Sequence, residues 1–125
     1  MKQIIASSHA PKAVGPYSQA VEANGTLYIS GQLPLNPETG KIVEGGVKEQ
    51  ATQCLHNIGE ILTEANYGFA DVVKSTVLLA DMNDFAVINE VYASFYKEPY
   101  PARVCYQVAK LPMGALIEIE TIAIK

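Results

Sequence analysis

An arginine and a pair of glutamates are the residues of this sequence best suited to chemistry on a small acid. Arg103 lies in the run 101–108, and Glu118 and Glu120 alternate in the run 117–121. The guanidinium group of an arginine is a planar set of donors that binds a carboxylate through two parallel hydrogen bonds. A glutamate beside it can orient or deprotonate a water, or move a proton on a bound substrate. Together, the two residue types predict a site for a small carboxylate.

Both runs favour strands, so strand geometry decides where these side chains point. Alternate side chains of a strand share a face, and Arg103, Cys105 and Gln107 are therefore expected on one face. Glu118 and Glu120 are expected on one face of the second strand. A hairpin between the two strands would bring the arginine and a carboxylate to the same face of the sheet. The alternative is an ordinary Arg–Glu pair on a solvated face, because such pairs are common and worth only about 0.2–1 kcal/mol.

Cys105 is a candidate nucleophile. The positive charge of Arg103, two residues away, would favour its thiolate. A nucleophilic cysteine also needs a histidine base, and the sequence places neither His9 nor His56 near it. We therefore interpret Cys105 as a small apolar side chain that lines the site.

Two short segments and one helical residue complete the candidates. The segment 15–19, which contains Tyr17, begins with a Gly-Pro turn. Ser30 and Gly31 end a predicted strand, where a glycine lets a ligand approach the backbone closely. Asn89 lies on a predicted helix outside its apolar stripe, so periodicity alone predicts a solvated position. The first two segments also have explanations without function, because a Gly-Pro pair forms turns and Tyr17 can simply pack as a strand residue.

Apolar spacing and turn signals predict elements in the order β, β, β, α, β, α, β, β. Asn24-Gly25 between two apolar runs is a strong hairpin signal. The clearest helix has apolar residues at intervals of three and four, and Asn83 is expected to cap the second helix. The expected strands are 2–6, 17–23, 26–31, 71–80, 103–109 and 116–124, with helices at 47–65 and after 83, and a long loop at 33–46.

Strands and helices do not alternate strictly in this order, which favours an α+β architecture over a doubly wound parallel sheet. We predict a two-layer sandwich with a mixed sheet of five to six strands and two helices on one face. The other face would keep apolar side chains from the strands at 71–80 and 116–124. Apolar patches of that size usually mark interfaces, so we expect a homo-oligomer in which open sheet faces meet.

Length and composition limit the class of protein. The 125 residues suit a single domain, 1–125. The net charge is −4 with 9 Lys+Arg and no basic run, which argues against general nucleic-acid binding. No apolar run reaches the roughly 18 residues of a membrane span, and the first residues lack a signal-peptide pattern. Cys54 and Cys105 match no metal-ligand spacing, and we expect a reducing, cytoplasmic location.

Several motifs, taken in order, resemble those of the reactive-intermediate deaminase family, also called RidA or YjgF. The resemblance covers essentially the whole chain. The matching segments are AVGPYSQ at 13–19, SGQLPL at 30–35, DMNDF at 81–85, NEVY at 89–92, PAR at 101–103, Cys105, VAKLP at 108–112 and IEIE at 117–120. One such block would be a weak signal, whereas all of them in order are highly specific.

The resemblance implies a chorismate-mutase-like α+β fold and a homotrimer with three clefts between subunits. It implies 2-iminobutanoate/2-iminopropanoate deaminase activity without metal or cofactor, in which imines left by pyridoxal-phosphate dehydratases become 2-oxo acids and ammonia. By the family pattern, Arg103 binds the substrate carboxylate with help from the Gly31 N–H, and Glu118 positions the water or moves the enamine-to-imine proton. The other cleft residues would be Tyr17, Ser30, Asn89 and Cys105, with Glu120 structural.

Three positions depart from the family pattern beside the arginine. The family often has Arg-Ser-Cys-Val-Glu-Val, whereas here Val104, Tyr106 and Gln107 replace Ser, Val and Glu. These changes leave the arginine and glutamate untouched, but they could alter the range of substrates. Two other functions stay open: a non-catalytic module that binds small carboxylates in the same cleft and regulates a partner, and the RNA cleavage reported for some relatives, which the acidic charge disfavours.

Overall fold

A tight turn at Asn24 and Gly25 joins β2 (Ala20–Ala23) to β3 (Thr26–Gln32), and the two strands pair antiparallel. Both turn residues have positive φ, +52° and +78°, which confirms the hairpin that the sequence predicts. β1 (Gln3–Ile5) adds to the outer edge of β2. Residues 17–19 are irregular and do not extend β2 as expected. The computed structural model describes all residues from 1 to 125.

Helix α1 (Val47–Glu64) forms where the apolar spacing is clearest. Its first turn is stabilised by Glu49, whose carboxylate accepts a hydrogen bond of 2.8 Å from the Gly46 N–H. The loop before the helix contains the small turn expected there, which a bridge between Leu35 and Ile42 closes. The buried side of α1 packs on β3 and on β6 (Ile117–Ile124), so the helix crosses the middle of the sheet.

Helix α2 (Phe85–Phe95) begins later than a cap at Asn83 predicts. A 3₁₀ turn at Met82–Asp84 precedes it, and the Asp81 carboxylate accepts the Asn83 N–H at 2.9 Å. The predicted cap is therefore wrong, because the aspartate two residues earlier caps this turn. Neither α1 nor α2 combines the length and apolarity needed to cross a lipid bilayer.

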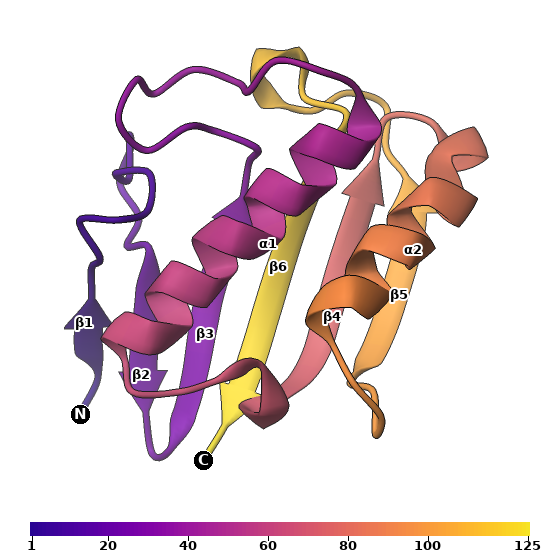
Figure 1. Ribbon diagram of the computed structural model, residues 1–125. Coiled ribbons are helices and arrows are strands. Elements are labelled where there is room, and N and C mark those ends of the chain that lie inside the picture. The colour runs from indigo at the N-terminus through magenta and orange to yellow at the C-terminus, as the bar shows by residue number, and fades with distance from the viewer.

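All six strands form one mixed sheet in the order β1-β2-β3-β6-β4-β5 (Figure 1). β6 is last in the sequence but lies between β3 and β4 (Val72–Leu79), antiparallel to both. β5 (Ala102–Gln107) pairs parallel to β4, because α2 carries the chain back between them. This topology confirms the predicted α+β class, and it separates β5 from β6 by one strand.

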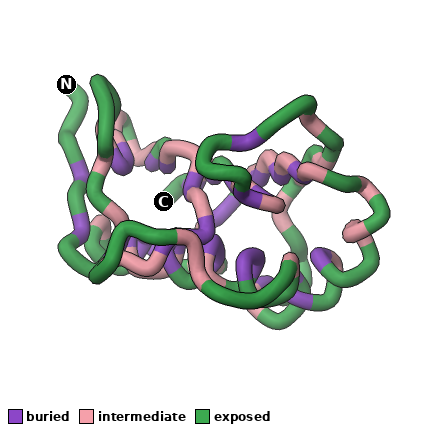
Figure 2. Tube along the Cα trace, turned by 90° about the horizontal axis from the view of Figure 1, so that it is seen from above, coloured by how far each residue is buried: buried purple, intermediate pink, exposed green.

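The core lies between the sheet and the two helices, which cover one face of it (Figure 1). A single cluster of 22 buried residues fills this space, and Figure 2 shows the exposed positions gathered along the outer loops. The uncovered face keeps apolar side chains, but mostly from strands other than the two expected to supply them, because only Ile124 belongs to one of those. The large exposed ones there are Ile4, Tyr28, Val104, Tyr106 and Ile124.

Candidate functional site

Arg103 lies on the helix-covered face of the sheet, at its β5 edge. It pairs in register with Ser75 of β4, which is fully buried. Its guanidinium carbon lies 4.8 Å from the ring centroid of Tyr92 and 5.5 Å from that of Phe85, both on α2. Neither ion pair of the protein includes Arg103. Its positive charge is therefore not neutralised within the protomer and is available to an anionic ligand.

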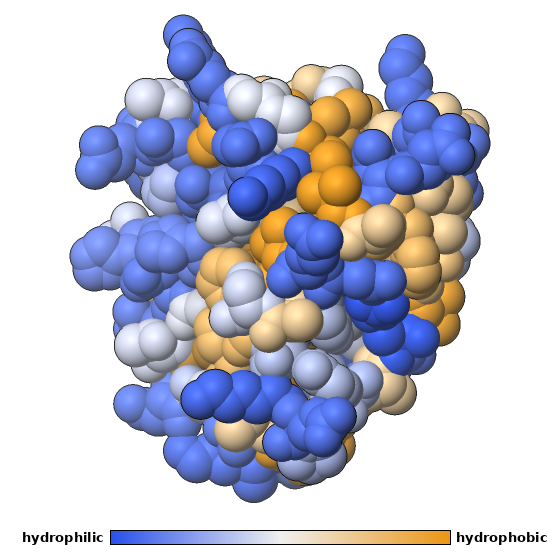
Figure 3. Space-filling model, turned by 45° about the vertical axis from the view of Figure 1, so that its right-hand side comes forward, coloured by the Kyte–Doolittle hydropathy of each residue, from blue (hydrophilic) through white to orange (hydrophobic).

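A cavity of about 380 Å³ opens beside this guanidinium. Figure 3 shows the side that carries α2 and β5, where apolar side chains gather among hydrophilic ones. Asn89 is half-buried and lines the cavity, although helical periodicity predicts a solvated position. The difference arises because α2 lies over the edge of the sheet (Figure 1), so a second flank of the helix borders the cavity. The lining residues are Asn89, Tyr92, Ala93, Tyr100, Pro101 and Arg103.

Cys105 follows Arg103 on the same face of β5 and is half-buried. Burial raises the pKa of its thiol, and the positive charge of Arg103 lowers that pKa by a smaller amount. Both histidines lie elsewhere, where they pair with Glu60 of α1. A neutral thiol without a histidine base suits the interpretation of Cys105 as a small apolar side chain that lines the site.

Glu118 lies on the uncovered face of the sheet. It pairs in register with Leu78 of β4, whereas its buried neighbours Ile117 and Ile119 point into the core. Burial raises the pKa of its carboxyl group, and the negative charge of Glu120 raises it further. Neither ion pair of the protein includes Glu118 or Glu120, so no basic side chain neutralises the two carboxylates of this face.

A β-bulge places Gly31 against the Glu118 carboxylate. Between the paired positions Ile29 and Gln32, β3 has two residues where β6 has only Glu120. A Cβ atom added at position 31 would overlap Oε2 of Glu118. Position 31 therefore has to be glycine for this carboxylate to keep its place beside the backbone.

Ser30 and Tyr17 lie close to this bulge. The Ser30 hydroxyl donates to the Ser18 carbonyl at 2.6 Å, and the Ser30 N–H donates to the Gln19 carbonyl at 2.9 Å. These bonds fix the segment that carries Tyr17, whose side chain is 49% exposed. The Tyr17 hydroxyl accepts only the Val14 N–H, at 3.3 Å, and its ring is therefore free to contact a ligand or another chain.

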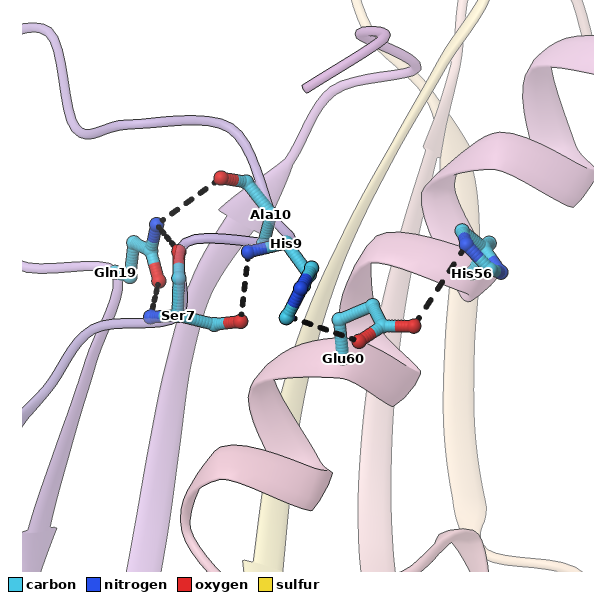
Figure 4. A network of polar contacts seen from close by, with 6 residues as sticks. All are labelled: Ser7, His9, Ala10, Gln19, His56 and Glu60. Carbon is cyan, nitrogen blue, oxygen red and sulfur yellow. Dashed lines mark hydrogen bonds and ion pairs between the residues drawn. The ribbon is translucent and has the colours of Figure 1, made fainter. Parts of the chain in front are cut away.

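Gln19 holds the N-terminal segment, a role that the sequence did not reveal. Its side-chain amide accepts the Ser7 N–H at 2.7 Å and donates to the carbonyls of Ser7 and Ala10 at 3.1 and 3.5 Å (Figure 4). It also donates to the Pro11 carbonyl at 2.9 Å. The side chain is 6% exposed. Its only sequence signal was membership of the segment 15–19, because the partners are 8 to 12 residues away.

The structure thus assembles the candidates into two clusters on opposite faces. Arg103, Asn89 and Cys105 form the first, which we call the guanidinium cluster. The second, the carboxylate cluster, consists of Glu118, Gly31 and Ser30, together with Tyr17, which the bond from Ser30 to the neighbouring Ser18 carbonyl holds near this strand. The predicted hairpin that joins the two strands on one face is wrong, because β4 lies between β5 and β6.

The two clusters have complementary chemistry. The guanidinium cluster can anchor an anion beside a cavity, and the carboxylate cluster can accept and return a proton next to an exposed backbone. No group of three histidine, cysteine or acidic side chains converges in a way that could hold a metal ion. Neither cluster by itself combines an anion anchor with a proton carrier.

Comparisons with known proteins match residues 7–125 to the family described as Endoribonuclease L-PSP. A mouse (Mus musculus) protein named 2-iminobutanoate/2-iminopropanoate deaminase is 53% identical over 125 residues, covering 100% of this chain and 93% of the relative. The solved structure of RidA from the Antarctic bacterium Psychrobacter has a TM-score of 0.95 and 50% identity, covering 98% of this chain and 99% of that one. YyfA of Yersinia pestis, a Rid family protein, has a TM-score of 0.97 and 43% identity, and covers 100% of both chains.

Proposed function

This chain belongs to the endoribonuclease L-PSP family, which includes the RidA proteins that its motifs resemble, and it is an enamine/imine deaminase; we propose that Arg103 and Glu118 carry out its reaction. The substrates are 2-aminoacrylate with its imine 2-iminopropanoate, and 2-iminobutanoate. The products are 2-oxo acids and ammonia. The observation that carries the assignment of roles is that one chain presents, on opposite faces of its sheet, a guanidinium and a carboxylate that no ion pair within the protomer neutralises.

The proposed reaction adds water to the imine carbon. Arg103 binds the substrate carboxylate through two N–H donors, with help from the Gly31 N–H. Glu118 takes a proton from the attacking water and returns it to the nitrogen as the C–O bond forms. The hydroxyl proton of the resulting carbinolamine then moves to the amino group, so that the C–N bond breaks, ammonia leaves and a carbonyl remains at C2. An enamine substrate is first protonated at C3, and the same carboxyl group can move that proton.

The two roles belong, in this proposal, to two different subunits. Arg103 and Glu118 lie on opposite faces of the protomer, so one chain offers each of them to a different neighbour. A contact of this kind joins unlike surfaces head to tail, and it closes into a ring when the rotation permits. We infer a homotrimer with three equivalent sites, and the exposed apolar side chains of the open sheet face supply surface for its interfaces.

The remaining candidates take supporting roles in the same proposal. Asn89 and Cys105 would line the arginine side of the cleft, and Tyr17 and Ser30 the glutamate side. Residues 1–125 would act as a single deaminase domain, supported by one sheet and one core. Pyridoxal-phosphate dehydratases would generate its substrates. The two unpaired thiols suit a reducing compartment, and we propose the cytoplasm.

The family description names an endoribonuclease, but the charge of this chain does not favour RNA as a substrate. It has 9 Lys+Arg against 13 Asp+Glu, and its one uncompensated arginine lies between aromatic rings. Binding to the phosphate backbone depends on several clustered cations. A filter assay should accordingly detect no salt-dependent binding of RNA.

A coupled assay tests the proposed roles. A dehydratase generates 2-aminoacrylate, and release of ammonia is followed with and without the purified protein. Arg103→Ala should lower kcat/KM by roughly 30-fold to several thousandfold, because removing one partner of a desolvated charge pair costs about 2–5 kcal/mol. Lys41→Ala, which removes an exposed cation from the loop before α1 and outside both clusters, is the control and should match wild type.

Two outcomes would contradict the assignment. Unchanged turnover in Arg103→Ala would remove this residue from the mechanism. Binding of 2-oxobutanoate in calorimetry without any shortening of the imine lifetime would favour the non-catalytic module instead. Glu118→Gln separates the two functions further, since it should abolish hydrolysis while carboxylate binding largely persists.

A further inference from the structure

Aromatic rings, and no carboxylate, hold the guanidinium group of Arg103. Tyr92 and Phe85, seven residues apart on α2, place their ring centroids 4.8 and 5.5 Å from its central carbon. A guanidinium attracted to a ring lies against it with its flat face, and its N–H groups stay free at the edge. This contact therefore holds the cation without using the donors that a substrate carboxylate would need.

A hydrogen bond and a stacked ring fix the position of Tyr92. Its hydroxyl donates to the Ser75 hydroxyl at 2.9 Å, and only 5% of the residue is exposed. Ser75 is the β4 residue that pairs in register with Arg103, so the ring is tied to the strand position beside the arginine backbone. Tyr96 stacks on Tyr92 from behind, with centroids 4.4 Å apart and an angle of 29° between the rings. The Tyr92 ring can hardly move without breaking one of these contacts.

The ring and the cation also belong to the same cavity. Tyr92 and Arg103 both line the hollow of about 380 Å³, and Phe85 is half-buried at the start of the same helix. Catalytic groups lose much of their rate advantage when they are misplaced by about 1 Å. A long, flexible arginine side chain therefore needs a rigid support, and α2 supplies one.

We propose that Tyr92 and Phe85 are positioning residues of the deaminase, which orient the Arg103 guanidinium edge-on to the substrate carboxylate. The proposal rests on the carboxylate-binding role of Arg103 given above. The purely structural alternative is that both rings only fill the core beneath α2. The two readings differ in one respect: a positioning residue acts through Arg103, whereas a core residue acts independently of it.

Tyr96 supplies a matched control. It is as deeply buried as Tyr92, at 2% exposure, and it stacks in the same aromatic group, but its ring makes no cation–π contact with Arg103. Its hydroxyl is buried close to Ser75 and Thr121 but makes no well-formed hydrogen bond to either. Tyr96→Phe therefore removes a hydroxyl from the same aromatic group without touching the arginine.

The experiment measures kcat and KM for imine hydrolysis in Tyr92→Phe, Tyr92→Leu, Phe85→Leu and Tyr96→Phe. Each substitution is made in the wild-type chain and in Arg103→Ala, and thermal unfolding confirms that every variant is folded. We expect KM to rise roughly tenfold in Tyr92→Leu and roughly threefold in Phe85→Leu and Tyr92→Phe, with kcat little changed. Tyr96→Phe should match wild type. In the Arg103→Ala background all of these effects should disappear.

Each result decides between the readings. Wild-type KM values in Phe85→Leu and Tyr92→Phe would overturn the proposal even if Tyr92→Leu fails to fold. Losses of equal size with and without Arg103 would also overturn it, because they would indicate a general effect on the fold. If Arg103→Ala alone hydrolyses imines like wild type, the proposed function itself fails, and that outcome is distinct from both.

Discussion

Arg103 and Glu118 project from opposite faces of the same sheet, with strand β4 between their strands. Arg103 pairs with Ser75 and Glu118 pairs with Leu78, and alternate residues of β4 point to opposite sides. The arginine is covered by α2, and the glutamate lies on the face that no helix covers. A reaction that needs both groups must therefore take each from a different copy of the chain.

Mixing two weakened variants should restore activity. Arg103→Ala lacks the carboxylate anchor and Glu118→Gln lacks the proton carrier, so each alone should keep at most a few per cent of the wild-type rate. After subunit exchange in an equal mixture, about one quarter of the sites should combine an intact arginine with an intact glutamate if neighbouring subunits share each site. Recovery of roughly a quarter of the wild-type rate in the coupled imine assay is the expected result.

The control for this mixture is a chain that carries both substitutions. Mixed with Arg103→Ala, it offers no intact arginine to any site and should restore nothing. If the mixture of the two single variants stays as weak as each alone after proven subunit exchange, then one chain supplies both groups, and the intersubunit site is wrong.

Activity should fall on the acid side at a higher pH than an ordinary glutamate would cause. Burial and then the negative charge of Glu120 raise the pKa of Glu118, which must be ionised to accept a proton from water. Glu120→Gln removes the second cause, so the acid limb of kcat/KM should move to lower pH. A limb that stays in place, or moves to higher pH, would show that Glu118 is not the group that titrates.

Glu118→Gln should stabilise the fold at neutral pH while it abolishes hydrolysis. Because the pKa of Glu118 is raised in the folded state, its protonated form is favoured there, and stability is lost as pH rises through this pKa. A neutral amide avoids that loss. The gain in the free energy of unfolding should be less than about 1 kcal/mol, because the side chain is partly solvated. Urea unfolding at neutral and acidic pH should show a gain for the variant at neutral pH only. A variant less stable than wild type at neutral pH would contradict the prediction.

The elements could be predicted because their signals are local. Asn24-Gly25 determines a turn by the φ angles of two neighbours, and α1 follows from apolar residues within one helix. The cap expected at Asn83 is absent because a 3₁₀ turn capped by Asp81 precedes α2, whose own N-cap, Asp84, makes no side-chain hydrogen bond.

The site could be predicted only in part, because it depends on strand order. Arg103 and Glu118 were identified by their chemistry, but their faces depend on β4 lying between β5 and β6, which no local pattern specifies. Periodicity alone assigns Asn89 to solvent, because it does not reveal that α2 lies over a sheet edge, and only the family resemblance places this residue in the cleft. Contacts between distant segments determine all of these features.

Gly31→Ala should abolish activity with little loss of stability. The added methyl group would overlap Oε2 of Glu118, which is the free end of a flexible side chain, so the carboxylate can turn away at small cost. A displacement of about 1 Å from the reacting atoms can cost about 100-fold in rate, and we expect kcat to fall by at least that much. The control is Gly46→Ala, because a Cβ there meets nothing closer than 3.9 Å, and it should keep wild-type kcat. Near-normal turnover in Gly31→Ala would mean that the observed position of the Glu118 carboxylate is not the one used in catalysis.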